Sequence, residues 1–151
     1  MLKDTLLYEY LENAKKLDEN KAWVYAFSEQ SIKDEIIRLI QDEQLQAGID
    51  ANGDIMGYYS LFTEWITNGR KQEGDPYTLE DTGAFYSSMF VKVGDDYFIV
   101  DADGQKDNEN LFVKFGDDII GLTDESIEKL NILVAEKYIE WLLQVGQLTP
   151  R

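Results

Sequence analysis

The 151-residue chain contains no histidine and no cysteine. Histidine is the usual general base near neutral pH, the commonest metal ligand and the base of Ser and Cys catalytic triads. Without cysteine as well, catalysis would have to rest on carboxylates, lysine, tyrosine or serine. The missing cysteines agree with a cytosolic location. We therefore expect a protein that is not an enzyme, holds no cofactor or metal, and acts by binding and assembly.

Long apolar runs are also absent from the sequence. No segment approaches the ~18 to 20 apolar residues of a membrane span, and the first residues, Met1-Leu2-Lys3-Asp4, lack the apolar stretch of a secretory signal. Hydrophobic residues still make up 44% of the chain and aromatic residues 13%, enough for a buried core. We expect one cytoplasmic domain over residues 1–151, without membrane association.

Basic residues are scarce. Fourteen Lys and Arg stand against thirty Asp and Glu, which gives a formal net charge of −16. Such a surface repels phosphate backbones, so direct sequence-specific nucleic-acid binding is not expected. Most of the acids are expected to form a solvated surface that keeps the protein soluble.

Apolar residues recur at helical spacing in three long segments. The first covers residues 4–17. Ser31 with Asp34 resembles a capping box and starts a second helix that ends near Gly48. Thr123 is the expected N-cap of a long C-terminal helix. The three apolar stripes are Leu2, Leu6, Leu7, Tyr10, Leu11, Ala14 and Leu17; Ile32, Ile36, Leu39, Ile40 and Leu45; and Ile127, Leu130, Val134, Tyr138, Trp141 and Val145.

Short β-branched and aromatic runs favour strands elsewhere. Residues 89–93 and 97–101, separated by Gly-Asp-Asp at 94–96, predict an antiparallel hairpin. Residues 22–27 fit a strand or a tight buried connection better than a helix, and residues 111–115 predict a third strand. The order of elements predicts an α+β fold, with a small antiparallel sheet packed with two to four helices and a long C-terminal helix.

Glycines punctuate the centre of the chain. Apolar residues at helical spacing predict a short helix within residues 58–66. The polar stretch that follows predicts a mobile loop at about residues 67–76, which carries Arg70 and Lys71.

Asp81, Thr82 and Gly83 follow this loop. Gly83 is expected to supply a positive φ where the chain enters the next element. Asp81 and Thr82 are expected to cap neighbouring backbone amides. Ser87 and Ser88 have no base beside them in the sequence, so no nucleophile is indicated.

The acidic residues form only incomplete catalytic or metal motifs. Asp50, Asn52 and Asp54 have the spacing that begins a calcium loop, but Leu61 stands where the bidentate Glu is required. Residues 101–109 fail in the same way, so both segments are expected to be polar turns. Paired carboxylates can hydrolyse glycosidic bonds, and a hydrolase stays a third hypothesis. Its candidate carboxylates are Glu64, Glu80, Asp81, Asp95 and Asp96.

Several short turn phrases stand in a fixed order along the chain. They are Gly48-Ile49-Asp50 with Gly53, then Gly57-Tyr58-Tyr59-Ser60 and Thr63, then the polar loop with Lys71 and Gly74, then Leu79 with Asp81-Thr82-Gly83, and last Phe115-Gly116-Asp117-Asp118-Ile119-Ile120-Gly121-Leu122-Thr123.

In this order the phrases resemble small virion-morphogenesis and minor tail (tail-completion) proteins of tailed bacteriophages and prophages, over about residues 40–145. The resemblance implies a non-enzymatic structural or assembly protein of a phage or prophage tail or head-tail junction. It implies self-association, with a ring-shaped homo-oligomer in the assembled particle, and contact with neighbouring tail or connector proteins. The implied location is the host cytoplasm during assembly and then the virion.

Five residues are candidates for assembly contacts under this resemblance. Arg70 and Lys71 belong to the loop, and Asp81, Thr82 and Gly83 to the entry into the strands. The alternative is a bacterial binding module, similar to an immunity or inhibitor protein, whose acidic face binds a basic protein partner.

Overall fold

The computed structural model describes residues 18–145, and this part of the chain is an α+β fold. The helix expected at residues 4–17 lies outside the described residues. The helices are α2 (Glu19–Ser28), α3 (Gln30–Arg38), α4 (Leu61–Ile66), α5 (Ala84–Ser87), α6 (Leu111–Phe115) and α7 (Asp124–Val145). A π-helical turn, η2 (Leu39–Gln44), and two 3-10 turns, η3 (Leu45–Ala47) and η4 (Asp117–Ile120), join them.

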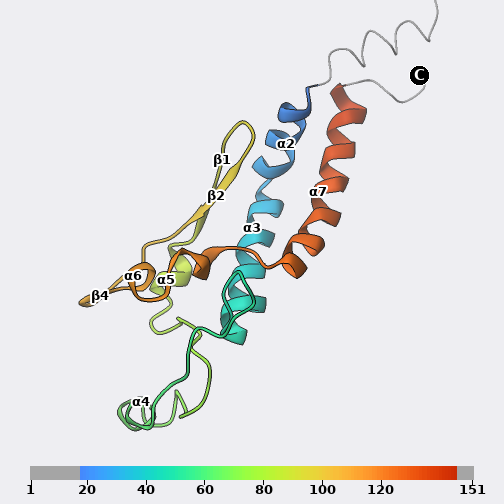
Figure 1. Ribbon diagram of the computed structural model, residues 1–151. Helices are drawn as coiled ribbons and strands as arrows, with labels where there is room; N and C mark the ends of the chain where they lie inside the picture. Colours follow the sequence, from blue (N-terminus) through green and yellow to red (C-terminus); the bar gives the residue numbers. More distant parts are fainter. Residues whose placement is uncertain (1–17, 146–151) are drawn as a thin grey trace, which may run out of the picture.

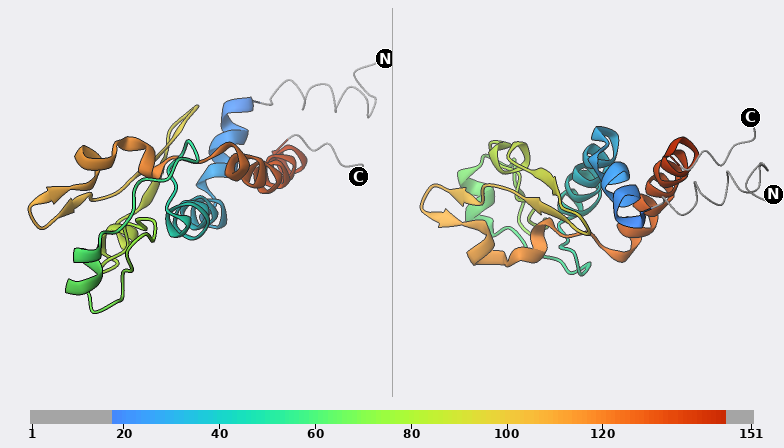
Figure 2. Two further views of the ribbon diagram at one scale, coloured as in Figure 1. Left: turned by 60° about the horizontal axis from the view of Figure 1, so that its bottom comes forward. Right: turned by 90° about the horizontal axis from the view of Figure 1, so that it is seen from above.

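The described strands form two small antiparallel sheets of two strands each. β1 (Phe90–Val93) pairs with β2 (Phe98–Asp101), and β3 (Gln105–Lys106) pairs with β4 (Glu109–Asn110). The second sheet was not expected from the sequence. Figures 1 and 2 show the arrangement: α2 and α3 lie between the β1–β2 hairpin on one side and α7 on the other.

Residues 22–27 form a helix, so the strand expected there was wrong. Ala22 and Ala26 lie one helical turn apart and are fully buried. Phe27 stacks on Phe98 of β2, with ring centroids 4.8 Å apart. At helical spacing, the apolar residues of this segment contact both α7 and the hairpin. These tertiary contacts outweigh the β propensity of its aromatic residues.

The second expected helix is confirmed, but it begins earlier than the capping box predicted. Its N-cap is Glu29, whose extended backbone separates α3 from α2, so Ser31 lies inside the helix. Asp34 accepts a hydrogen bond from the side chain of Gln30 at 2.7 Å. The helical run ends at Gly48, which has a φ of +76°.

The predicted hairpin is confirmed, with Phe90 opposite Asp101 and Val93 opposite Phe98. Its turn is one residue longer than expected, because Tyr97 lies in the turn and its carbonyl accepts a hydrogen bond from the Gly94 amide at 2.8 Å. The Tyr97 ring lies against Gly94, where any side chain would collide with it.

Residues 111–115 form α6, so the third strand expected there was wrong. Asn110 caps this helix: its Oδ1 accepts hydrogen bonds from the amides of Phe112 at 3.0 Å and Val113 at 3.2 Å. An Asn at this position favours a helix start over a strand. Val113, the β-branched residue of the run that suggested a strand, is 88% exposed.

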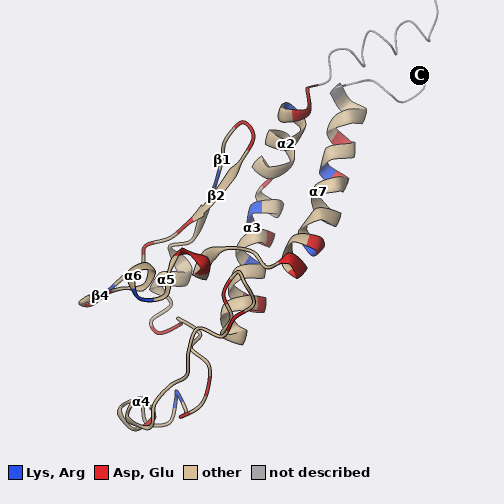
Figure 3. Ribbon diagram, in the orientation of Figure 1, with Lys and Arg blue, Asp and Glu red and all other residues tan. Residues whose placement is uncertain are grey.

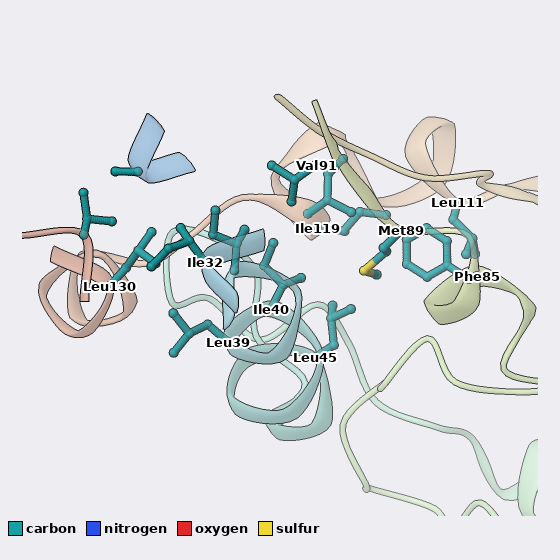
Figure 4. Close-up of a cluster of buried hydrophobic side chains, with 14 residues drawn as sticks. Ile32, Leu39, Ile40, Leu45, Phe85, Met89, Val91, Leu111, Ile119 and Leu130 are labelled. Atoms are coloured by element: carbon teal, nitrogen blue, oxygen red, sulfur yellow. The ribbon is translucent and has the colours of Figure 1, made fainter. Parts of the chain in front are cut away.

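The core lies where α3, η2, the hairpin, η4 and α7 meet (Figure 4). The buried cluster comprises Ala26, Ile32, Ile36, Leu39, Ile40, Leu45, Phe85, Met89, Val91, Leu111, Ile119, Ile120, Leu130 and Val134.

Thr123 is the N-cap of α7 as predicted, since its Oγ1 accepts a hydrogen bond from the Ser126 amide at 3.1 Å. Within the described residues no helix has the length and apolar character that crossing a bilayer requires.

Candidate protein-interaction site

A lobe formed by residues 57–77 projects from the core and carries α4 at its far end (Figure 1). Its two chain segments pair at the neck: Tyr58 and Pro76 form an antiparallel bridge. Beside this bridge the Tyr59 amide donates to the carbonyl of Asp75 at 2.9 Å. We call residues 57–77 the α4 lobe.

The α4 lobe exposes large apolar side chains. Ser60 caps the helix through a hydrogen bond from the Thr63 amide to its Oγ at 3.2 Å, which confirms the short helix expected in this region. No residue of α4 is buried. Exposed apolar side chains grouped on one small element are typical of surfaces that bind other molecules, so α4 is the candidate interaction surface. The exposed fractions are 62% for Leu61, 65% for Phe62, 75% for Trp65 and 58% for Ile66.

The loop after α4, where mobility is predicted, is hydrogen-bonded to the helix. Thr67 donates its hydroxyl to the Thr63 carbonyl at 2.8 Å and accepts from the amide of Lys71 at 3.2 Å. The Glu73 amide donates to the Glu64 carboxylate at 2.8 Å. Helix and loop are therefore linked into one unit, and the mobility of the loop stays a prediction.

Lys71 of the lobe lies within ion-pair distance of Asp81, so the structure brings together two candidates that the sequence offered separately. Asp81 Oδ2 lies 2.9 Å from Lys106 Nζ, and Asp81 Oδ1 lies 3.5 Å from Lys71 Nζ. The hydrogen bond from Lys106 and the charges of both lysines lower the pKa of Asp81 below its ordinary value. The expected role of Asp81 as an amide cap is replaced by this double ion pair.

Lys106 belongs to the site, and sequence reasoning missed it. It stands in β3, 25 positions after Asp81, and no local pattern connects the two residues. The pairing exists because β3 passes beside the loop that enters α5, where Lys106 and Asp81 line the same small cavity of about 40 Å³.

The other candidates have local roles. Gly83 has a φ of +83° and Thr82 Oγ1 accepts a hydrogen bond from the Ala84 amide at 3.3 Å, so both predictions are confirmed. Arg70 donates its Nε to the Thr67 carbonyl at 3.4 Å. Within residues 18–145 no ion pair joins Arg70 to a carboxylate. Arg70, Lys71 and Asp81 line one hollow of about 310 Å³.

Aromatic side chains connect the neck of the lobe to the core. Tyr59 and Tyr77 pack edge to face with ring centroids 4.8 Å apart, and Tyr77 contacts Phe115 in the same manner at 5.7 Å. Tyr86 donates its hydroxyl to the Thr78 carbonyl at 2.6 Å. Burial raises the pKa of Tyr86 above its ordinary value. The neck is thus anchored by packing and hydrogen bonds.

The predicted polar turn at Asp50 is confirmed. Asp50 Oδ1 accepts hydrogen bonds from the amides of Asn52 at 2.8 Å and Asp54 at 3.1 Å. In the described part of the chain, no three acidic side chains are grouped so as to hold a metal ion. The hydroxyl groups of Ser87 and Ser88 donate to the carbonyls of Gly83 and Phe85.

Acidic side chains are spread over the described elements, as Figure 3 shows. They occur on the helices, in the hairpin turn and in the connections, while lysine and arginine are few. Lysine and arginine are thus interspersed among the acidic residues of the described elements.

Comparisons of the chain with protein-family models, with curated proteins and with solved structures found no match. The resemblance to phage tail proteins therefore has neither support nor contradiction from them, and it stays a prediction.

Proposed function

We propose that the protein is a non-enzymatic structural protein of a phage or prophage tail or head-tail junction and acts by subunit association. The observation that carries the association is α4, which holds four large apolar side chains in solvent on a projecting lobe. Aromatic side chains such as Phe62 and Trp65 are typical anchors of protein interfaces.

The architecture of the lobe supports a role as a contact element. The paired neck and the ion pairs of Asp81 with Lys71 and Lys106 hold α4 at a defined place relative to the core. A preorganised apolar element loses less conformational entropy on binding than a free segment does. The turn phrases around Gly48 and Gly83, which resemble those of minor tail proteins, support the phage assignment.

The negative charge supports a position beside a DNA channel. A net charge of −16 gives a surface that DNA does not adhere to, so DNA would pass without being retained. The partners proposed here are copies of the chain itself and neighbouring tail or connector proteins. The proposed location is the host cytoplasm during assembly and the finished virion.

Deleting the coding sequence from the phage or prophage genome tests this function. We expect particles whose heads and tails are unjoined or whose tails are incomplete, as seen by electron microscopy, together with loss of infectivity. Complementation with the wild-type chain restores infectious particles, and complementation with Phe62→Gln/Trp65→Gln does not, because α4 then lacks its aromatic anchors.

The matched control changes two exposed apolar residues of α7, Ile132→Gln/Ile139→Gln. These side chains are 66% and 55% exposed, against 65% for Phe62 and 75% for Trp65, and they lie on another element. The control variant restores particles if α4 is the contact surface. Normal infectious particles without the gene would contradict the proposed function.

The alternative, an acidic binding module for a basic protein partner, is favoured by the excess of acidic residues. Asp95 and Asp96, for example, both lie in the β1–β2 turn without a lysine or arginine partner in the described structure. This alternative predicts a tight complex with a basic nuclease or toxin that weakens steeply with salt. Asp95→Asn/Asp96→Asn would weaken that complex, whereas the α4 variant would leave it unchanged.

A further inference from the structure

A second apolar surface lies on the side of the core. It is a groove of about 820 Å³ between β2, α6, η4 and the first turns of α7. Phe98, Val100, Phe112 and Leu130 line it. Ile99 is 47% exposed and Ile127 is 41% exposed, and both line the groove as well.

We propose that α4 of one copy of this chain docks in this groove of the next copy. The inference rests on the proposed assembly function and names the partner of the α4 lobe. The projecting helix and the groove have no residue in common, so one copy uses both surfaces at the same time. Association is therefore head to tail.

Head-to-tail contacts have a geometric consequence. When each subunit offers a different surface to each neighbour, the assembly closes into a ring or grows as a helical filament. A ring agrees with the ring-shaped homo-oligomer that the resemblance implies. A two-fold dimer through α4 alone would leave the groove uncovered.

The exposed apolar area is of the right size. Leu61, Phe62, Trp65 and Ile66 of α4 are each more than half exposed. Together they present on the order of 500 Å² of side-chain surface, which is most of the ~800 Å² that each partner buries in a standard interface. The remainder comes from the loop beside α4.

Local charges match across the proposed contact. Arg70 stands four positions after the end of α4 and donates to the Thr67 carbonyl, and no carboxylate pairs with it among the described residues. Asp101 and Asp117 line the groove, and neither has a lysine or arginine partner in residues 18–145. Asp101 Oδ1 accepts the Ala102 amide at 2.8 Å, whereas the Asp117 carboxylate accepts no hydrogen bond within the described residues, and we assign Asp117 as the partner of Arg70.

A mixing experiment tests the contact, using two variants of the full chain. The lobe variant carries Phe62→Gln/Trp65→Gln and keeps its groove, and the groove variant carries Ile99→Gln/Ile127→Gln and keeps its α4. Analytical ultracentrifugation should show wild-type oligomers, two monomeric variants, and a 1:1 dimer in their equimolar mixture. The dimer cannot grow, because its remaining surfaces are both altered.

Charge reversal provides a second readout. Arg70→Glu should weaken self-association about tenfold, and adding Asp117→Arg to the same chain should restore it, because the ion pair re-forms with opposite polarity. All substituted side chains in both experiments are exposed, and circular dichroism should show the wild-type fold in every variant.

Two results would overturn the inference: a mixture that stays monomeric while the wild type oligomerises, or a wild-type chain and a mixture that are both monomeric at millimolar concentration. Either result leaves the phage assembly function standing, since that function is judged by the gene deletion. Conversely, the mixture could form the lobe-groove dimer while particles stay normal after gene deletion. That outcome would support the contact and contradict the proposed function.

Discussion

The buried side chain of Gln44 holds the backbone of Thr123 at the start of α7. Gln44 Oε1 accepts a hydrogen bond from the Thr123 amide at 3.0 Å, and its Nε2 donates to the Gly121 carbonyl at 2.7 Å. Gln44 is 1% exposed. One amide group in the π-helical turn after α3 therefore satisfies two backbone groups and fixes where the longest described helix begins.

Replacing Gln44 with leucine should destabilise the protein by about 2 to 4 kcal/mol, because it leaves two partly buried backbone groups without partners. Urea unfolding followed by circular dichroism measures the change. Gln72→Leu is the matched control: Gln72 is exposed, and its change should stay within about 0.5 kcal/mol. Equal effects of the two substitutions would contradict the bridging role of Gln44.

Asp81→Asn should reduce stability at neutral pH by at most about 1 kcal/mol, since the ion pairs with Lys71 and Lys106 are partly solvated. The lysines lower the pKa of Asp81 in the folded state. This stabilisation is therefore present above the unfolded-state pKa of about 3.9 and is lost as the pH falls through the lower folded-state value.

The difference in unfolding free energy between wild type and Asp81→Asn should shrink as the pH is lowered from 7 to about 2.5, below the ordinary carboxyl range. Urea unfolding at several pH values measures this difference. Asp95→Asn, in the β1–β2 turn, is the control for removing a carboxylate that has no ion pair in the described structure. A difference for Asp81→Asn that stays constant with pH would contradict the ion pairs.

Tyr86→Phe should cost about 1 kcal/mol at pH 7, because the hydrogen bond to the Thr78 carbonyl is lost. Burial raises the pKa of Tyr86, so the folded state requires the neutral phenol. The wild type should lose stability as the pH rises above the unfolded-state value of about 10. The phenylalanine variant lacks this loss, so the gap between the two unfolding free energies should narrow from pH 9 to 11.

Hydrogen exchange tests the predicted mobility of residues 67–76. Their amides should exchange faster than those of α3 and α7, because the loop lies on the surface and has no buried apolar residue. Glu64→Ala removes the acceptor of the Glu73 amide and should accelerate exchange there further. Glu128→Ala in α7 should leave the loop unchanged. Exchange of the loop as slow as that of α3 would show that it is rigid.

The sequence predicted correctly those elements whose conformation depends on residues close to them in the chain. The β1–β2 hairpin follows from two β-branched runs around a Gly-Asp-Asp turn, and α7 follows from the Thr123 cap and a periodic apolar stripe. The positive φ of Gly83 is equally local. Caps, turns and periodicity act over a few residues, which is why the sequence alone is sufficient for them.

The sequence did not predict the structure of segments whose conformation is set by distant partners. Residues 22–27 are helical because Phe27 stacks on Phe98 and the two alanines pack closely in the core. Residues 111–115 are a different case: they are helical because the adjacent Asn110 caps the helix, a local signal that the β-branched and aromatic run concealed. In both segments short-range propensity was ambiguous, and contacts or caps outside the run decided the outcome.

By itself the sequence determined that this is an acidic α+β chain without histidine or cysteine chemistry, with a short helix within residues 58–66. The tertiary structure alone decided that α4 projects with its apolar side chains in solvent, that Lys106 joins Lys71 on Asp81, and that Gln44 reaches Thr123. The physical reason is that helical periodicity states which residues share a face, whereas burial and pairing depend on which distant segments cover that face.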